Sequence, residues 1–136
     1  MQVEPYLDFN GACDEAIEFY KSALGAKVNM LVRFKDMPAS AGSGEHASVQ
    51  NKVMHSSLQI GNSVVLMSDG RCTGQTNFHG IALTLTVKDD AEASRVFNAL
   101  AEGGKINMPL AKTFFSSNFG MLNDRFGVGW MVIVQG

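Results

Sequence analysis

The sequence predicts an α+β fold of two βαβββ modules, whose curved mixed sheets surround a cleft and whose helices lie on the outer faces. The main observation is a repeated segment, Gly-x-Lys-x-Asn-Met, at residues 25–30 and again at 103–108. Each copy follows an amphipathic helical segment and begins a stretch of alternating apolar and polar residues. Repetition at a fixed spacing is typical of an internally duplicated fold. We therefore expect one domain over residues 1–136, with its modules at about 1–70 and about 78–136.

Composition agrees with a compact globular protein. The chain has 136 residues, of which 46% are hydrophobic and 18% charged, which excludes a disordered or collagen-like chain. A net charge of −2 without a basic stripe argues against nucleic acid or an anionic membrane as partner. We see no apolar run of membrane-spanning length and no signal-peptide pattern, so we expect a cytoplasmic protein in which Cys13 and Cys72 are reduced thiols.

The first module begins with alternating residues at 5–9, which predict a short half-buried strand. Asn10 is expected to cap a helix over residues 12–24. The predicted apolar stripe of this helix consists of Cys13, Ile17, Tyr20 and Leu24, and Gly25 is expected to end it.

Three further strands complete the first module. The second strand is predicted from Val28, Met30, Val32 and Phe34, which alternate with Asn29, Leu31 and Arg33. Residues 53–60 and 62–69 predict a hairpin that turns at Gly61-Asn62. Residues 35–51 contain Pro38, Gly42 and Gly44 beside several small polar residues, with little apolar content. They predict a long loop, which fits either a lid or arm, or a tolerated insertion.

The second module repeats this order. A strand is expected over 81–87, and Asp89 with Glu92 resembles a capping box at the start of a helix over 90–102. Its apolar stripe consists of Ala93, Val96, Phe97 and Leu100, and Gly103-Gly104 is expected to end it. Further strands are predicted at 105–110, at about 114–122 and at about 128–135.

Several motifs resemble those of a known superfamily. The opening Pro5-Tyr-Leu-Asp-Phe-Asn-Gly11, with Ala16-Ile-Glu-Phe-Tyr20 and Leu24-Gly25, resembles the vicinal oxygen chelate proteins, which include glyoxalase I, bleomycin-resistance proteins and extradiol dioxygenases. Later motifs are similar to the PhnB-like branch, many of whose members are labelled 3-demethylubiquinone methyltransferase-like. These motifs are His55 before Gly61, Leu66-Met-Ser-Asp69, and Thr113-Phe-Phe, Phe119-Gly, Asp124-Arg-Phe-Gly-Val and Trp130. The resemblance implies paired modules around a cavity, usually in a homodimer.

The resemblance also implies a test for a metal. Metal-dependent members place His, Gln or Glu on the first and last strands of each module, four ligands in all. The matching strands here offer Tyr6 and Asp8, then Leu66–Ser68, Ala82–Thr86 and Met131–Ile133. Asp8 is the only strong ligand type among them, and His79 lies before its strand. Because one carboxylate does not hold a catalytic metal, we expect neither a metal nor another cofactor.

The methyltransferase label has no support from the motifs. An enzyme of this kind that uses S-adenosylmethionine commonly needs a Gly-rich loop directly after a parallel strand. Gly42-Ser43-Gly44 lies inside the long predicted loop, and Gly103-Gly104 is a predicted helix end. We therefore do not expect methyl transfer.

The candidate site residues are those that strand alternation turns toward the predicted cleft. They comprise Tyr6, Asp8, Thr84 and Thr86, then His55 and Ser57, with Phe114, Phe119 and Trp130 as aromatic walls. This set suits a mostly apolar or aromatic small molecule that is oriented by a few polar groups. Structural interpretations stay open: the aromatic residues also fit the core, the threonines also fit solvent-facing strand positions, and His55 also fits a backbone-bonded histidine.

Two kinds of function follow from these residues. The first is a metal-free binding protein that holds a small apolar or aromatic molecule between the modules of a homodimer. The alternative is a lyase-, isomerase- or transferase-type enzyme that uses His55 and Asp8 as acid and base on a carbonyl or enolisable substrate. A fold that has lost its activity is a third interpretation. We favour binding, because no set of nucleophile, base and orienting group is visible in the sequence.

Overall fold

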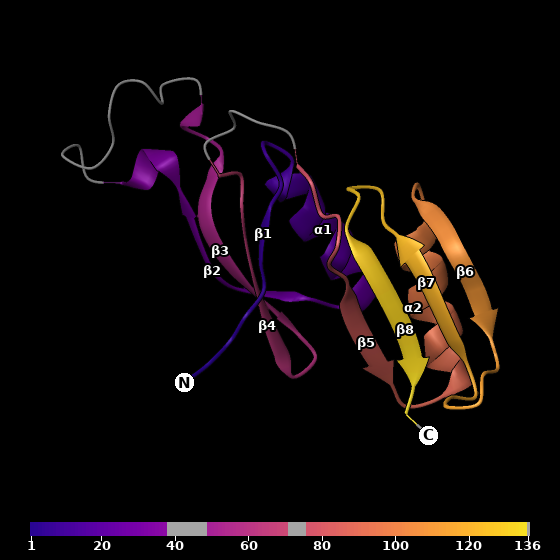
Figure 1. The fold of residues 1–136 in the computed structure, drawn as a ribbon. Coiled ribbons are helices and arrows are strands. Elements are labelled where there is room, and N and C mark those ends of the chain that lie inside the picture. Colours follow the sequence, from indigo (N-terminus) through magenta and orange to yellow (C-terminus); the bar gives the residue numbers. More distant parts are fainter. Residues whose placement is uncertain (38–48, 71–75, 136) are drawn as a thin grey trace. The chain divides into compact units, whose positions relative to one another are not determined.

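The computed structural model describes residues 1–37, 49–70 and 76–135, and these contain eight strands and two α-helices. The chain divides into two compact units, Met1–Thr76 and Asn77–Gly136. Each unit contains one helix and one four-stranded mixed sheet (Figure 1). The predicted α+β class and the βαβββ order of both modules are therefore confirmed. Neither helix of the described residues is long and apolar enough to cross a membrane.

The first unit has a short parallel strand pair at one edge of its sheet. Its elements are β1 (Tyr6–Asp8), α1 (Cys13–Leu24), β2 (Lys27–Arg33), a 3₁₀ turn (Phe34–Asp36), β3 (Val53–Ile60) and β4 (Ser63–Ser68). The sheet order is β1-β4-β3-β2, with β1 parallel to β4 and the other pairs antiparallel. Ile60 pairs with Ser63, so the predicted two-residue turn at Gly61-Asn62 is confirmed.

The second unit has the same topology. Its elements are β5 (Leu83–Val87), α2 (Asp90–Ala101), β6 (Lys105–Ala111), β7 (Phe119–Asn123) and β8 (Gly129–Val134). The sheet order is β5-β8-β7-β6, with β5 parallel to β8. The ribbon of Figure 1 shows α2 along one face of this sheet.

Each core lies between a sheet and its helix. The predicted stripe of α2 is completely buried, and in α1 Cys13, Ile17 and Tyr20 are buried while Leu24 is partly exposed. On the strands, buried residues such as Leu58 and Val132 alternate with partly exposed ones. Among the described residues, no α-helix of the same unit packs on the opposite face of each sheet, and we call it the open face.

The repeated motif encodes a β-bulge in both units. Val28 pairs with the buried Leu58, but Met30 pairs with Ser57 on the open face, and the same shift separates Ile106 from Met108. The alternation predicted for Val28 and Met30 on one face is therefore wrong, because the extra residue of a bulge changes the phase of the strand.

The asparagine of each bulge takes part in the same hydrogen-bond relay. Asn29 donates to the Gln59 side chain, which donates to the carbonyl of Gly61. Asn107 donates in the same way to Asn123, which donates to the carbonyl of Gly127. The relay ties each edge strand to a hairpin turn through the side chain of a central strand.

The start of α1 differs from the prediction. The N-cap residue is Ala12, without a side-chain hydrogen bond, and Asn10 adopts a positive φ of 48°. The carboxylate of Asp69, from the end of β4, instead accepts the backbone N–H groups of Gly11 and Cys13 at 2.7 and 2.8 Å. A distant carboxylate thus stabilises the positive end of the helix, a role that Asn10 was expected to fill.

Other boundaries also moved. Phe34 begins a 3₁₀ turn instead of continuing β2, and β7 begins only at Phe119, because Thr113 and Ser116 form a hydrogen-bonded turn before it. Asp89 caps α2 as predicted and accepts the N–H of Glu92 at 2.8 Å. Most of the predicted loop at 35–51 lies outside the described residues.

Candidate functional site

The open face of the first sheet combines apolar and polar side chains. Tyr6, Leu66, Ser57 and Met30 are cross-strand neighbours over all four strands. Tyr6 is 50% exposed and Met30 45%. Partners in a sheet project to the same side, so these side chains form a continuous, partly exposed row.

His55 lies on this open face, as predicted, beside Tyr6. The hydroxyl of Tyr6 is 3.1 Å from Nδ1 of His55, and the ring centroids are 5.6 Å apart. When the hydroxyl donates to Nδ1, the proton of the neutral imidazole resides on Nε2 and is available to a ligand. When the hydroxyl accepts, Nε2 is the free acceptor. Tyr6 therefore orients the imidazole in either tautomer.

Asp8 has other partners. Its carboxylate accepts the backbone N–H of Asn10 at 2.9 Å and lies directly against Gly70, where a Cβ would collide with it. The φ of 56° at Gly70 also favours glycine. Asp8 is thus engaged in the turn after β1, and the hydrogen-bond partner of His55 is Tyr6, with Ser57 on the same face of β3.

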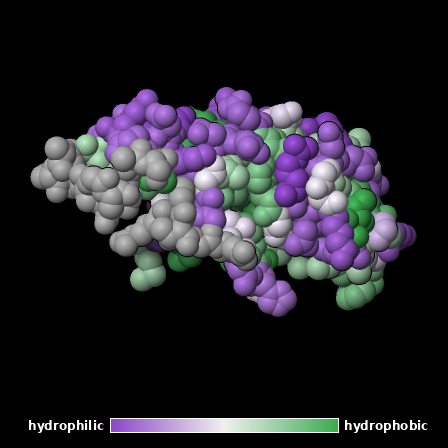
Figure 2. Space-filling view, turned by 90° about the horizontal axis from the view of Figure 1, so that it is seen from above, coloured by the Kyte–Doolittle hydropathy of each residue, from purple (hydrophilic) through white to green (hydrophobic). Residues whose placement is uncertain are grey.

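The open face of the second sheet is more apolar. Thr84, Met131, Met121 and Met108 form the row equivalent to that of Tyr6. Thr86, Ile133, Phe119 and Ala111 form the next row. Both threonines are exposed, so their predicted place in a cleft stays a prediction. One view of the surface, in Figure 2, shows hydrophobic residues exposed among hydrophilic ones.

The three predicted aromatic walls lie in different surroundings. Phe114 is completely exposed and stacks edge-on against Phe115, which does the same against Phe119. Trp130 is only 3% exposed, and its indole N–H donates to the buried carboxylate of Asp124 at 2.9 Å. Phe119 therefore belongs to the open face, whereas Trp130 belongs to the packed interior at one end of the sheet.

The donor set of the open faces does not fit a divalent metal. The strands that carry ligands in metal-dependent vicinal oxygen chelate proteins present Leu66 and Ser68, Thr84 and Thr86, and Met131 and Ile133, with Asp8 as the one carboxylate. Hydroxyl and thioether groups are poor ligands for zinc, iron or manganese. Among the described residues, three or more His, Cys, Asp or Glu side chains nowhere lie close enough together to hold a metal ion.

The perturbed titratable groups lie at the helix side of the first unit. Burial raises the pKa of the Cys13 thiol to about 12, and the nearby carboxylate of Asp69 adds to the shift. Hydrogen bonds from Arg33, both at 2.9 Å, lower the pKa of Asp14. Arg33 also donates to the carbonyl of Asn51, so it joins the ends of β2 and β3 to α1. These groups stabilise the unit and do not face the candidate site.

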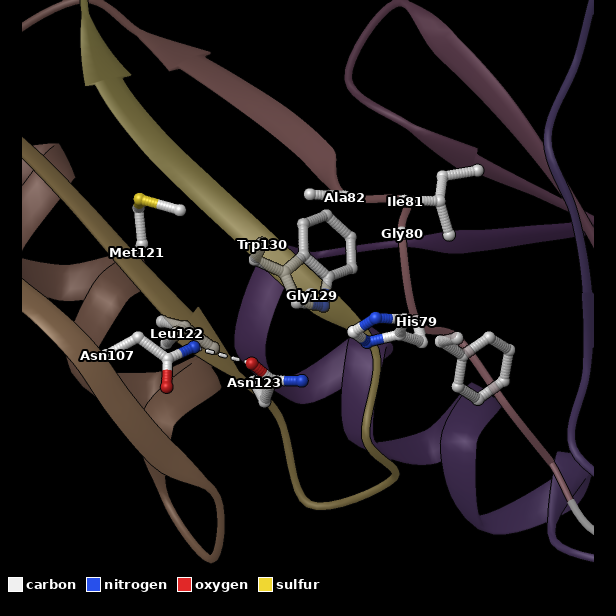
Figure 3. A pocket seen from close by; sticks show the side chains of 11 residues that line it. His79, Gly80, Ile81, Ala82, Asn107, Met121, Leu122, Asn123, Gly129 and Trp130 are labelled. Atoms are coloured by element: carbon white, nitrogen blue, oxygen red, sulfur yellow. Dashed lines mark hydrogen bonds between the residues drawn. The ribbon is translucent and has the colours of Figure 1, made fainter.

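A pocket of about 180 Å³ lies at one end of the second sheet (Figure 3). It is lined by Phe78, His79, Gly80, Ile81, Ala82, Asn107, Met121, Leu122, Asn123, Gly129 and Trp130. Figure 3 shows the Asn107–Asn123 hydrogen bond at one side and Trp130 in the middle of the lining. Of this set, only Trp130 was expected to contact a ligand. Asn107 belongs to the repeated Gly-x-Lys-x-Asn-Met motif, which was the one sequence feature that pointed to it. The motif does not show that Asn107 lies beside a pocket, because that position depends on the β-bulge.

Comparison with known proteins gives the family. A family model described as 3-demethylubiquinone-9 3-methyltransferase matches residues 1–133. Protein YjdN of Escherichia coli is 36% identical over 98% of this chain and 95% of its own length. The crystal structure of PA1353 from Pseudomonas aeruginosa shares 41% identity, with a TM-score of 0.85 over 99% of this chain and 98% of that one.

Two further structures connect this family to the wider fold. The PhnB protein of Bacillus cereus, titled a putative 3-demethylubiquinone-9 3-methyltransferase, is 26% identical, with a TM-score of 0.81 over 98% and 99% of the two chains. The fosfomycin resistance protein FosX of Mesorhizobium loti is 8% identical, with a TM-score of 0.62 over 98% and 90%, and shares the fold alone. The chain therefore belongs to the PhnB-like, 3-demethylubiquinone-9 3-methyltransferase family, with the fold of the vicinal oxygen chelate superfamily.

Proposed function

We propose that this chain binds a small apolar or aromatic molecule on the open faces of its sheets, without a metal ion. The observation that carries the proposal is the hydrogen-bonded Tyr6–His55 pair on a partly exposed surface that also presents the apolar side chains of Leu66 and Met30. Binding sites for small molecules commonly combine an apolar lining with a few polar groups that fix orientation. The cleft expected between the two modules stays a prediction.

The proposed contacts divide by chemistry. His55, Tyr6 and Ser57 supply directional hydrogen bonds in the first unit, and the hydroxyls of Thr84 and Thr86 supply them in the second. Met30, Met108, Met121 and Met131 supply flexible apolar surface, which adapts to ligands of different shape. Phe119 adds an aromatic ring, Phe114 offers an exposed one, and Trp130 supports the pocket of the second unit from the interior.

The enzymatic alternative receives support from the same hydrogen bond. A tyrosine that orients an imidazole leaves its second nitrogen ready for proton transfer to or from a carbonyl or enolisable substrate. Asp8 contributes less to this alternative, because its carboxylate is engaged by the turn at Asn10. We prefer binding, because acid–base catalysis needs a second positioned acid or base. Among the described residues near His55, the candidates for this second group are the hydroxyls of Tyr6 and Ser57.

The activity in the family's description is not part of our proposal. Gly103-Gly104 lies in the turn between α2 and β6, and Gly42-Ser43-Gly44 lies outside the described residues. The turn between β1 and α1 holds Asn10 and Gly11, and the Asp69 carboxylate already occupies the N–H groups that open this helix. An anionic cofactor group would compete with that carboxylate.

Two wider properties complete the proposal. We propose a homodimer, because open faces with partly exposed apolar side chains are stabilised when a second copy covers them. We also propose a cytoplasmic location, from the composition and the reduced thiol expected at Cys13.

Native mass spectrometry after incubation with a panel of aromatic carbonyl compounds tests the proposed function. We expect a bound organic mass that survives treatment with EDTA, on a protein of dimer mass. The proposal fails if the organic ligand binds only after zinc, nickel, iron or manganese has been added and if that metal stays on the protein through dialysis.

A further inference from the structure

We propose that the pocket of the second unit binds one neutral, single-ring molecule whose edge carries both a hydrogen-bond donor and an acceptor. This inference rests on the proposed function, because it gives the ligand chemistry of one part of the open face. It adds a subsite built from Asn107, Asn123 and Gly129, to which the sequence assigned no role.

The size of the pocket selects a single ring. Its volume is about 180 Å³. An engineered protein cavity of about 150 Å³ is known to bind benzene. One six-membered ring with a small substituent therefore fills the space, whereas a fused or branched ligand extends onto the rows of Thr84 and Thr86.

The lining selects a neutral molecule. None of the described residues around the pocket is Asp, Glu, Lys or Arg. Ile81, Ala82 and Met121 form apolar walls, and the buried Leu122 and Trp130 lie beneath them. His79 is the one titratable side chain among the described lining residues, so an ionised ligand would lose hydration without gaining a permanent opposite charge, which disfavours carboxylates and phosphates.

The two amides select the polar edge. Asn123 accepts from Asn107 at 2.5 Å and donates to the carbonyl of Gly127 at 3.1 Å, so the relay fixes its orientation. A carboxamide offers two N–H hydrogens and one acceptor oxygen. After its bond to Asn123, Asn107 retains one N–H and its oxygen, and its side chain lies at the pocket. This pair matches a ligand edge such as a carboxamide or a lactam.

The pocket depends on divergence between the modules. In the first sheet, Gln59 pairs with Lys27 and Val64; in the second, Asn123 pairs with Lys105 and Gly129. Glycine thus stands where the first module has a valine, and a shorter amide stands where it has glutamine. A Cβ added to Gly129 would lie 3.1 Å from the Ile81 carbonyl and 3.5 Å from the Cβ of Ala82. Glycine at 129 therefore lets β8 lie close to the Ile81–Ala82 segment at the edge of the pocket, where a side chain has little room.

Three matched probes separate these requirements. Benzamide has the ring and the donor–acceptor edge, benzoate has the same shape with a charge, and toluene has the ring alone. Trp130 is the only tryptophan and lines the pocket, so its fluorescence and its indole N–H signal in NMR report binding there. We expect benzamide to shift that signal saturably and to bind about tenfold or more tightly than either other probe.

Two variants close the pocket by different routes. Gly129→Ala adds the tight Cβ, and Ala82→Leu places a large side chain at an exposed position of the lining. We expect both to weaken benzamide binding by about tenfold or more while thermal melts show a folded protein. Asn107→Ala should weaken benzamide but not toluene. Asn29→Ala, which removes the equivalent relay bond in the first module, should leave benzamide binding unchanged.

Specific results overturn the inference. These are benzoate binding as well as benzamide, no saturable shift of the Trp130 signal by benzamide, or unchanged binding in a folded Ala82→Leu variant. They leave the proposed function standing if aromatic ligands still perturb the Tyr6–His55 surface. If aromatic ligands leave the Tyr6–His55 surface unperturbed while benzamide still binds in the pocket, the proposed function is rejected and the inference about the pocket stands.

Discussion

At the scale of single residues, His55 is the most direct test of the open-face site. It is partly exposed, and its hydrogen-bond partner Tyr6 is 50% exposed, so water replaces the lost bond in His55→Ala. We expect the free energy of unfolding to change by less than about 1 kcal/mol and the affinity for an aromatic ligand to fall about tenfold. A thermal melt beside a ligand titration separates these effects, with Ser63→Ala on the same sheet as control. A strongly destabilised variant with normal binding would show a structural histidine.

Asp69 connects three backbone segments of the first unit. Its side chain is fully buried and accepts three backbone N–H groups, those of Gly11, Cys13 and Val53. Asp69→Ala leaves these donors without an acceptor, so we expect the free energy of unfolding to fall by about 3 kcal/mol or more. Asp89→Ala, at the exposed cap of α2, is the control and should cost about 1 kcal/mol. Equal losses in chemical denaturation would contradict this role.

Cys13 is predicted to be unreactive while the protein is folded. Burial raises the pKa of its thiol from 9.0 to about 12, so almost no thiolate exists at neutral pH. Because the folded pKa exceeds the unfolded one, this group's contribution to stability is complete below about pH 9 and is lost as the pH rises toward 12. In a Cys72→Ser variant, a thiol reagent should modify Cys13 only at the rate of unfolding. Rapid modification of the native protein would contradict the burial.

At the scale of elements, the bulge relays are the clearest product of the duplication. Asn29 and Asn107 each tie an edge strand to a central one by a single exposed side-chain hydrogen bond. We expect Asn29→Ala and Asn107→Ala each to lower the free energy of unfolding by about 1 kcal/mol. Hydrogen exchange should quicken in β2 for the first variant and in β6 for the second. Faster exchange throughout both units would contradict the prediction, because it would show that each relay stabilises the whole fold and not only its own edge strand.

The elements also show what the sequence could and could not predict. Helix stripes and hairpin turns follow from short-range patterns, so α2, its Asp89 cap and the Gly61-Asn62 turn were all predictable. The bulges were not, because an inserted residue preserves the apparent alternation of Val28 and Met30 while placing them on opposite faces. The cap from Asp69 was hidden for another reason: it joins residues far apart in sequence.

At the scale of the whole molecule, the two modules keep one framework and differ in chemistry. The row of Tyr6, Leu66, Ser57 and Met30 corresponds to that of Thr84, Met131, Met121 and Met108. The first module thus holds the polar Tyr6–His55 pair with one methionine, Met30, and the second holds three methionines in the equivalent row. Cross-strand register, which alternation alone does not give, determines the Tyr6–His55 bond, the pocket at Gly129 and the face on which Met30 lies.

The open faces also lead to a prediction about assembly. Partly exposed methionines and aromatic rings on each open face favour burial against a second copy. We expect a homodimer at micromolar concentration in sedimentation equilibrium. A monomeric mass throughout that range would contradict the prediction.

The most direct test of metal-free binding on the open faces is NMR of the methionine methyl groups, titrated with small aromatic carbonyl compounds in EDTA. Met30, Met108, Met121 and Met131 lie on the open faces, whereas Met67 is fully buried on the opposite side of its sheet and serves as an internal control. We predict saturable shifts of signals from the first four and an unchanged Met67 signal. Shifts that require an added divalent metal, or that affect Met67 while the other four stay unchanged, would contradict the account.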